Sequence, residues 1–528
     1  MSKIAVPYET DVQNLYETLL QSAKRFPEKT ALIDDEGQIN YADFLKRVDQ
    51  IADHLYFTLG IRPGDKIAIM QVNSIHFCCS FYAAVKIGAI AVMVNTKLQA
   101  PEIQYILSHT EASVLMISPK WWEKVSEILP ETSVKQIVFD KKIEIPEICQ
   151  SISFSDHLDR SDHYICHTET FRDMHCTAVI MFTSGTTGKP KGAMMSHYNL
   201  MQNLLSYADL LKMDEEEVVV VPIPLFHITG LGCILNLFVF LGATVVIMST
   251  FDPFVVLEKI EQHKATHFHG VPMVFITLTK AMEVFKGNLS SLKTALCGGG
   301  FITHEAICAL KKHIPGLDFR PVYGLTETSG AGVGFPCDYL TISKPASAGQ
   351  VRSVAEVMIL DGDGKELPSE TAGEICFRGP SVIKQYYGMP ELQDGILHTG
   401  DVGRFDQDGF LYIMDRIKDV VNRGGEKIFS LEVENVIMEI DEIRQVAVYG
   451  LPNEVYGEIV AAAIVLSENS ILTKEQIHEF LKPRLAKYKI PQIIDFVSEL
   501  PTNANNKVVK AALRRKYQEE NPSIPTFC

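Results

Sequence analysis

The chain has 528 residues, of which 46% are hydrophobic and 22% are charged. This composition is typical of globular proteins, and the length predicts two or more domains. The formal net charge of −16 disfavours non-specific binding to nucleic acids, and it means that an anionic substrate needs a locally positive site. The 11 cysteines are an odd number without a C-x-x-C pair, which favours reduced thiols and predicts a cytoplasmic protein.

Short apolar strands alternate with helices along the first 300 residues. We expect strands at 67–70, 90–94 and 113–117, with helices at 75–87 and 101–108. The same alternation returns later, with strands at 218–221, 244–248, 266–269 and 294–297 and helices at 226–241, 253–263 and 272–285. Strands without polar alternation that are separated by helices indicate parallel sheets covered on both faces. We therefore predict an α/β fold with two doubly wound, mainly parallel sheets in a large N-terminal domain.

The segment 228–248 carries no charged residue and is long enough to span a bilayer. Gly242 and Ala243 interrupt it, and a β-branched run follows at 244–247. We expect a buried helix that leads into a buried strand, without stable insertion into a membrane.

The pattern changes from about residue 355. Short strands at 374–378 and 410–414 alternate with Gly/Asp turns, which predicts a small antiparallel β region. After Lys418 we expect a helix, two strands and a second helix at 431–438, 445–449, 459–465 and 474–484. The predicted domains are therefore 1–417, which includes the small β region, and a small α+β domain at 418–528.

The run Met-Phe-Thr-Ser-Gly-Thr-Thr-Gly-Lys-Pro-Lys-Gly at 181–192 is rich in groups that bind phosphate. Glycines let backbone N–H groups approach an anion, and hydroxyl and ammonium groups supply donors and positive charge. Two residues separate Gly185 from Gly188, whereas the common P-loop has four residues between its glycines. A merely flexible loop is the alternative interpretation of this composition.

This run resembles the phosphate-binding loop of the adenylate-forming superfamily, which contains acyl- and aryl-CoA synthetases, luciferases and the adenylation domains of peptide synthetases. Further segments are similar to the family's motifs and follow its order: 323–327 (Tyr-Gly-Leu-Thr-Glu), 399–401 (Thr-Gly-Asp), 415–419 (Asp-Arg-Ile-Lys-Asp), 423–428 and 501–510. The resemblance implies that ATP activates a carboxylic acid as an acyl-adenylate, that pyrophosphate leaves, and that coenzyme A then takes the acyl group.

The resemblance also implies roles for individual residues. Contacts to the β- and γ-phosphates fall to Thr183, Ser184, Gly185, Thr186, Thr187, Gly188 and Lys189. Glu327 would hold Mg²⁺, which a carboxylate that faces a triphosphate requires, and Thr326 would contact the α-phosphate. The walls of the adenine site would be Tyr323, Gly324, Gly298, Gly299, Gly300 and Phe301. Asp401 would accept hydrogen bonds from the ribose, and Arg416 would add a ribose or phosphate contact. A surface acid at Glu327 and core packing of Tyr323 are the alternatives.

The C-terminal motif implies that Lys507 is the lysine that reaches the reacting carboxylate and the α-phosphate. The family usually has Gly before this lysine; here Asn506 precedes it, and Asn tolerates the left-handed backbone conformation. Lys510 is the alternative. The resemblance makes Lys418 the hinge of a mobile C-terminal domain, or otherwise an exposed linker residue. Gly424 and Gly425 would let the pantetheine arm of coenzyme A pass.

The segment Pro-Leu-Phe-His-Ile-Thr-Gly at 224–230 resembles the form found in acyl- and aryl-CoA synthetases. Amino-acid adenylation domains have an Asp nearby that pairs with the substrate ammonium, and none occurs between residues 222 and 250. His227 would line the acyl pocket, with a structural histidine as the alternative. Its predicted neighbours are small or apolar: Ile228, Leu231, Val271, Ala331 and Val333. They predict an apolar aliphatic or aromatic monocarboxylic acid as substrate.

Two other functions stay open at this point. One is a luciferase-like or other adenylate-forming enzyme with a different acceptor, and the other is a nucleotide-binding pseudo-enzyme, which the atypical lysine motif would allow. The expected partners are a small carboxylic acid and coenzyme A, with no nucleic acid, and the protein is expected to be a monomer or a homodimer.

Overall fold

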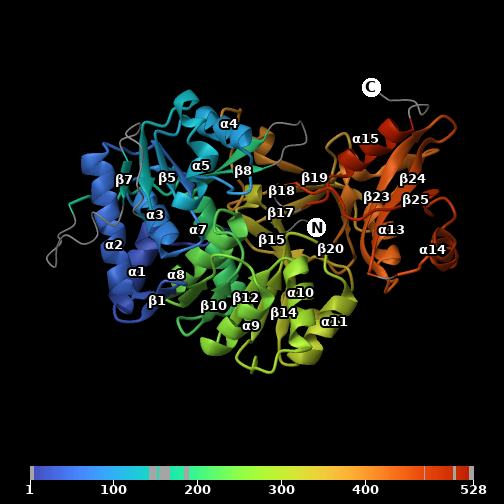
Figure 1. Ribbon diagram of the computed structural model, residues 1–528, viewed down its shortest axis with the longest axis horizontal. Coiled ribbons are helices and arrows are strands. Elements are labelled where there is room, and N and C mark those ends of the chain that lie inside the picture. Colours follow the sequence, from blue (N-terminus) through green and yellow to red (C-terminus); the bar gives the residue numbers. More distant parts are fainter. Residues whose placement is uncertain are drawn as a thin grey trace. The chain divides into compact units, whose positions relative to one another are not determined.

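The computed structural model describes residues 5–141, 151–153, 167–183, 190–468, 470–503 and 507–521 (Figure 1). By contacts between Cα atoms the chain divides into two compact units. The first unit comprises Met1–Val357 and Phe377–Leu397, and the second comprises Met358–Cys376 and His398–Cys528. Lys418 falls inside the second unit, so the domain boundary and the hinge predicted there stay predictions.

One sheet of the first unit has the strand order β7-β6-β5-β3-β4-β8-β9. Its strands are β3 (Lys66–Met70), β4 (Ile90–Met93), β5 (Val114–Ile117), β6 (Gln136–Phe139), β7 (Ser151–Ser153), β8 (Thr177–Thr183) and β9 (Lys191–Ser196). Every neighbouring pair is parallel except β8 with β9. The connections include α3 (Ile75–Lys86), α4 (Ala100–Thr110), α5 (Trp122–Val125), η2 (Pro119–Trp121) and η3 (Leu129–Glu131).

Nine consecutive strands of a second, 13-stranded sheet belong to this unit, in the order β16-β15-β14-β13-β12-β10-β11-β1-β2. Its strands are β1 (Thr30–Ile33), β2 (Gln38–Asn40), β10 (Val218–Val221), β11 (Thr244–Ile247), β12 (His267–Gly270), β13 (Thr294–Cys297), β14 (Asp318–Leu325), β15 (Gly330–Gly334) and β16 (Gly349–Val351). The pairs from β14 to β1 are parallel. Helices α9 (Pro253–Gln262), α10 (Pro272–Met282), α11 (His304–His313) and α12 (Tyr339–Ile342) follow strands of this sheet.

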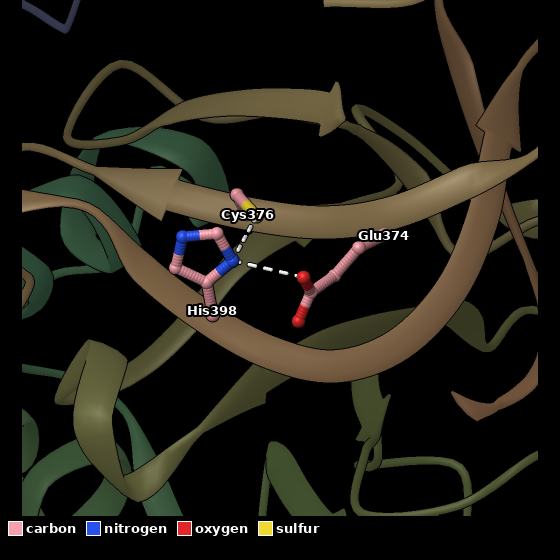
Figure 2. A group of neighbouring side chains, drawn as sticks. All are labelled: Glu374, Cys376 and His398. Atoms are coloured by element: carbon pink, nitrogen blue, oxygen red, sulfur yellow. Dashed lines mark hydrogen bonds and ion pairs between the residues drawn. The ribbon is translucent and has the colours of Figure 1, made fainter. Parts of the chain in front are cut away.

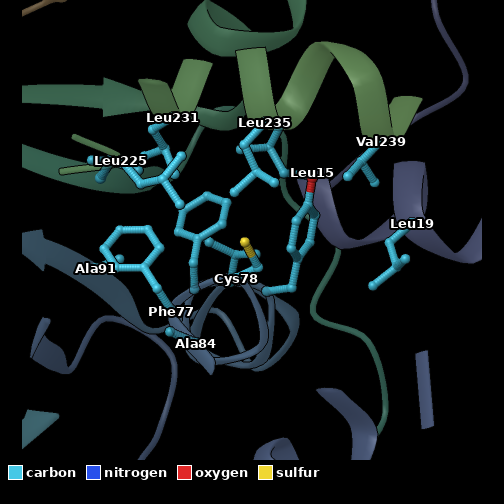
Figure 3. Packing of buried hydrophobic residues seen from close by; sticks show 14 of the residues in the cluster. Leu15, Leu19, Phe77, Cys78, Ala84, Ala91, Leu225, Leu231, Leu235 and Val239 are labelled. Atoms are coloured by element: carbon cyan, nitrogen blue, oxygen red, sulfur yellow. The ribbon is translucent and has the colours of Figure 1, made fainter. Parts of the chain in front are cut away.

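Residues of both sheets share one core cluster, which also takes in the helices between them. These helices are α1 (Leu15–Arg25), α2 (Tyr41–Asp53), α3, α7 (His197–Leu211) and α8 (Leu237–Leu241), with π-helical segments η1 (His54–Thr58) and η4 (Thr229–Asn236). In Figure 3 the side chains of Leu15 and Leu19 on α1 lie close to those of α3 and of the η4–α8 segment. Helix α3 is buried on nearly every side, which explains why its sequence is apolar without a polar stripe.

The apolar segment at 228–248 forms η4 and α8, which end at Gly242 with φ of +78°, and then the fully buried strand β11. The predicted buried helix and strand are therefore confirmed. The helix begins later than residue 226, because residues 224–227 form a turn in which the His227 N–H donates to the Pro224 carbonyl at 3.2 Å. Among the described residues, no helix combines the length and the apolar character that crossing a membrane requires.

The second unit contains most of a β region with the order β17-β18-β19-β20, and its last two strands are antiparallel. These strands are β17 (Glu356–Leu360), β18 (Gly373–Arg378), β19 (Leu397–Phe405) and β20 (Phe410–Arg416). The rest of the unit is α+β, with strands β21 (Val421–Arg423), β22 (Glu426–Ile428), β23 (Ile443–Asn453), β24 (Gly457–Leu466) and β25 (Ile493–Phe496) and helices α13 (Ser430–Ile437), α14 (Lys474–Leu481) and α15 (Lys510–Glu520). The short 3-10 turn η7 (Ile417–Asp419) lies in this unit, whereas η5 (Thr326–Thr328) and η6 (Gln393–Gly395) lie in the first. The predicted α/β class, with a large N-terminal part of two mainly parallel sheets and a smaller C-terminal part, is confirmed.

Candidate functional site

The predicted phosphate-binding loop connects two antiparallel neighbours, β8 and β9. Thr183 is the last residue of β8, and it pairs with Lys191, the first residue of β9. The predicted contacts Ser184, Gly185, Thr186, Thr187, Gly188 and Lys189 lie outside the described residues. The loop therefore begins at the carboxyl end of β8, which is also paired with the parallel strand β4, and it returns to the chain at the start of β9.

Glu327 lies on η5, directly after β14, with only 8% of its surface exposed. Its Oε1 accepts hydrogen bonds from Thr183 Oγ1 at 2.9 Å and from the Tyr386 hydroxyl at 3.2 Å. The Glu327 carbonyl also accepts the Ile383 N–H at 2.9 Å. The structure therefore brings the base of the phosphate loop and the predicted metal-binding carboxylate together.

Tyr386 and Lys191 complete this cluster, and no role was predicted for either of them. An isolated bridge pairs Tyr386 with Ala193 of β9, and the Lys191 ammonium lies 5.4 Å from the centre of the Tyr386 ring. Burial, with the Glu327 carboxylate adding to it, raises the pKa of Tyr386 well above its usual value, so the hydroxyl stays a donor. Lys191 stands inside the 181–192 run and could have been included, whereas nothing in Gln-Tyr-Tyr-Gly-Met-Pro marks Tyr386.

The predicted adenine-binding residues occupy the ends of two adjacent strands. Gly298, Gly299, Gly300 and Phe301 follow β13, and Tyr323 and Gly324 lie on β14, the parallel neighbour of β13. Tyr323 is half-buried, with its ring centre 5.8 Å from that of Phe377. A Cβ atom at Gly298 would lie 3.0 Å from the Val322 side chain, so the backbone approaches β14 closely. Strand β14 continues to Leu325, where its last residues form an antiparallel pair with β15.

His227 lies half-buried in the turn that precedes η4. Its ring centre is 4.6 Å from that of Phe226. Gly230, three residues later, has no room for a side chain, because a Cβ atom there would lie 2.4 Å from the Pro224 carbonyl oxygen. Three of the predicted apolar neighbours, Ile228, Leu231 and Val333, are buried.

In the second unit, Asp401 and Arg416 face each other across β19 and β20. Their residues are a register pair, and Arg416 Nε lies 3.1 Å from Asp401 Oδ1. Asp401 is 5% exposed, whereas the Arg416 side chain is 40% exposed. The ion pair compensates the charge of the nearly buried carboxylate, and the predicted nucleotide contacts of both residues stay predictions.

The structure separates the two candidate lysines clearly. Lys510, at the start of α15, lies 2.7 Å from Glu434 Oε1 and donates to Ser430 Oγ at 2.5 Å. Ser430 Oγ in turn donates to Asp415 at 3.0 Å, which makes a buried polar network. Lys507 is exposed, and two hydrogen bonds, of 2.9 and 3.0 Å, join it to Asn503. Lys510 is therefore held inside the second unit, and the role predicted for Lys507 toward a substrate stays a prediction.

Gly424 and Gly425 form the two-residue turn between β21 and β22, with φ of +58° and +92°. Such a turn requires positive φ at both central residues, so the hairpin alone explains the glycines. Lys418 lies exposed on η7, and its carbonyl accepts from both terminal nitrogens of Arg514 at 3.4 Å. The roles predicted for these residues toward coenzyme A and as a hinge stay predictions.

Comparison with known proteins identifies the family. The protein-family model described as "AMP-binding enzyme" matches residues 19–387, and the family model described as "AMP-binding enzyme C-terminal domain" matches residues 432–507. The chain belongs to the AMP-binding enzyme family. The predicted adenylate-forming family is therefore confirmed.

The names of two relatives of this AMP-binding enzyme specify different acids. A feruloyl-CoA synthase of Amycolatopsis sp is 32% identical over 96% of this chain and 99% of its own length. A long-chain-fatty-acid–CoA ligase of Bacillus subtilis (strain 168) is also 32% identical, over 98% of this chain and 96% of its own.

The chain also resembles solved structures of the o-succinylbenzoate-CoA synthetase MenE from Bacillus subtilis, at 29% identity. The complex with the acyl-adenylate intermediate matches with a TM-score of 0.83, and the match covers 95% of this chain and 98% of the MenE chain. The complex with ATP and magnesium has a TM-score of 0.81, with coverage of 94% and 98%. The predicted class of acid–thiol ligase is confirmed, with ATP and coenzyme A as substrates and Mg²⁺ as the metal ion of the family.

Proposed function

We propose that this AMP-binding enzyme is an ATP-dependent acid–CoA ligase for an apolar aliphatic or aromatic monocarboxylic acid. It forms the acyl-adenylate with release of pyrophosphate and then transfers the acyl group to coenzyme A. The observation that carries the proposal is the meeting of Thr183, Glu327 and Tyr386 at the base of the phosphate loop. The relatives named for ferulate and for long-chain fatty acids support both kinds of acid.

The first half-reaction brings two anions together, the carboxylate and the triphosphate. Catalysis therefore depends on positioning and on positive charge that is already in place. Oxygen ligands such as Glu327 and Thr183 suit Mg²⁺, which when bound neutralises phosphate charge. Two hydroxyl donors fix one carboxylate oxygen of Glu327, so the carboxylate keeps its orientation before the nucleotide arrives.

Further residues bind the nucleotide, promote adenylation and select the acid. Thr326, next to Glu327, contacts the α-phosphate, and Tyr323 stacks on the adenine. Lys507 supplies the mobile positive charge for adenylation. His227 and the buried apolar residues after it set which acid is accepted.

The second half-reaction requires a different face of the C-terminal domain. In the proposed cycle Lys418 is the hinge, and rotation exchanges Lys507 for the turn at Gly424 and Gly425, past which the pantetheine arm runs. Free thiols at all the cysteines within the described residues support a reducing compartment, and we place the enzyme in the cytoplasm as a monomer or homodimer.

A pyrophosphate-release screen over a panel of carboxylic acids tests the proposal. Release should require ATP, Mg²⁺ and an apolar acid, and thioester should appear when coenzyme A is added. Release without any thioester would favour a luciferase-like enzyme or another acceptor. Nucleotide binding without release for any acid would favour a pseudo-enzyme.

A further inference from the structure

Three side chains with metal-binding atoms, none of which was assigned a role above, converge on two neighbouring strands of the second unit, next to the motif at 399–401 (Figure 2). Glu374 and Cys376 are two residues apart on β18, so they share one face of the strand. His398 lies on β19, the next strand in the sheet. The carboxylate oxygen, the sulfur and the ring nitrogen lie within 4.8 Å of one another.

The contacts at His398 do not fit a proton relay. In a relay of the Cys-His-carboxylate type, the thiol and the carboxylate occupy opposite nitrogens of the imidazole ring. Here Nδ1 alone faces both partners, with Glu374 Oε2 at 2.8 Å and Cys376 Sγ at 3.4 Å. All three atoms therefore point to one place, which is the arrangement that a single cation needs.

The distances are close to those of a zinc site. With Zn–S of about 2.3 Å, Zn–N of about 2.0–2.1 Å and tetrahedral angles, sulfur and nitrogen ligands lie about 3.6 Å apart and nitrogen and oxygen ligands about 3.4 Å apart. The observed 3.4 Å between Sγ and Nδ1 is nearly that spacing. A small rotation of the Glu374 side chain would widen the 2.8 Å contact between Oε2 and Nδ1.

The surroundings also suit a metal site. The Gly400 N–H donates to Glu374 Oε1 at 3.0 Å, which leaves Oε2 for the cation, as is common for carboxylates that bind metals. Cys376 is buried, whereas the His398 side chain is 58% exposed, so an ion can enter from solvent and keep water as a further ligand.

We propose that Glu374, Cys376 and His398 form a binding site for a borderline-soft divalent cation of the Zn²⁺ class. Sulfur, imidazole and carboxylate together select such a cation over Mg²⁺, which prefers oxygen ligands only. The site is therefore distinct in its chemistry from the magnesium that Glu327 serves in the ligase reaction.

Titration of the chelator-treated protein with Co²⁺ tests the site, because a thiolate bound to cobalt gives a near-ultraviolet charge-transfer band. We expect one Co²⁺ per chain with this band, bleached by Zn²⁺ and unaffected by excess Mg²⁺. Cys376→Ser should abolish the band. His398→Gln and Glu374→Gln should each weaken binding by more than about tenfold, since even a supporting partner of a ligand is worth about 10–100-fold.

Two control variants separate this site from other thiols. Cys308 and His304 have the same 3.4 Å separation between sulfur and ring nitrogen, but they belong to no group of three ligands among the described residues, so Cys308→Ser should leave the band unchanged. Cys166→Ser removes a thiol that has histidines at 163 and 167 in the sequence, and it should also bind normally.

Absence of the band in the parent protein, or its survival in Cys376→Ser, would overturn the proposal. If Cys376→Ser fails to fold, the exposed His398 supplies the decisive variant, and unchanged affinity in His398→Gln would overturn the proposal equally. No nucleotide or acid is present in this titration, so its outcome is independent of the ligase activity.

Discussion

Thr183 Oγ1 donates to Glu327 Oε1 at 2.9 Å although 144 residues separate them in the sequence. The same oxygen accepts from Tyr386 at 3.2 Å, so two hydroxyls hold one carboxylate oxygen at the base of the phosphate loop. Hydrogen bonds to charged groups contribute about 1.5–3 kcal/mol. The orientation of Glu327 is therefore set by the protein before any metal binds.

The first prediction concerns Tyr386→Phe, which removes one of these two donors. We expect the Mg²⁺ concentration for half-maximal pyrophosphate release to rise severalfold, because Glu327 loses part of its orientation. Glu327→Gln should raise it further and slow adenylation, since the charge itself is lost. The matched control is Tyr387→Phe, whose hydroxyl donates to the Thr110 carbonyl at 3.4 Å instead of to Glu327. Equal effects of the two Tyr→Phe variants would contradict the role of Tyr386.

The second prediction separates Lys507 from Lys510. Lys507→Ala should slow adenylate formation by about 10²–10³ and spare thioester formation from supplied acyl-adenylate, because one oriented donor is lost at a developing charge. Its melting temperature should not change, since the residue is exposed. Lys510→Ala should instead destabilise the protein by about 3–5 kcal/mol, because it leaves Glu434 buried without its cation. Normal stability and lost adenylation in Lys510→Ala would exchange the two assignments.

The parallel sheets could be predicted because their strands are apolar runs bounded by helices. The strands at 218–221 and 294–297 match β10 and β13 to the residue. The same reasoning could not place β1, which pairs with β11 across 213 residues of sequence, Leu32 with Val245. Nothing in a local pattern indicates which distant strand completes a sheet.

Site residues that belong to a sequence motif could be predicted, whereas residues that only the tertiary structure brings to the site could not. The motif at 323–327 and Thr183 could be identified from the sequence, whereas Tyr386 reaches Glu327 only because residue 386 bridges to β9. In the same way Lys510 is engaged by Ser430 and Glu434, about 80 residues earlier, which the sequence gives no reason to expect.

The third prediction concerns the acid-binding role of His227. His227→Ala should change the ranking of acids in a substrate panel more than the apparent affinity for ATP. The physical reason is that His227 precedes the buried apolar residues Ile228 and Leu231, on the strand-end turn before η4. Competition between a short and a long acid, measured at fixed ATP, gives the ranking directly. A change confined to ATP affinity would instead place the ring at the nucleotide.

The fourth prediction concerns acid stability. Burial lowers the pKa of His197, His267 and His269 to about 3, and His197 Nδ1 accepts the Leu15 N–H at 3.2 Å as a neutral ring must. Each folded pKa is below the unfolded value of about 6.5, so their stabilising effect is complete above that pH and is lost as the pH falls toward 3. Each histidine contributes about 1.4 kcal/mol per pH unit to this loss.

Melting temperatures measured between about pH 7 and pH 5 check this expectation. His197→Gln, whose amide oxygen can accept the same N–H, should flatten the dependence on pH. His313→Gln is the control, because His313 is exposed. An identical dependence of the melting temperature on pH in His197→Gln and in the parent would show that folding does not lower the pKa of His197.

The most direct test of the ligase assignment is the stoichiometry of a single turnover with ATP, Mg²⁺, coenzyme A and the best acid of the panel. Pyrophosphate, AMP and acyl-CoA should form in equal amounts, with acyl-adenylate accumulating only when coenzyme A is omitted. Cleavage of ATP to ADP and phosphate, or acyl-adenylate that persists in the presence of coenzyme A, would contradict the account.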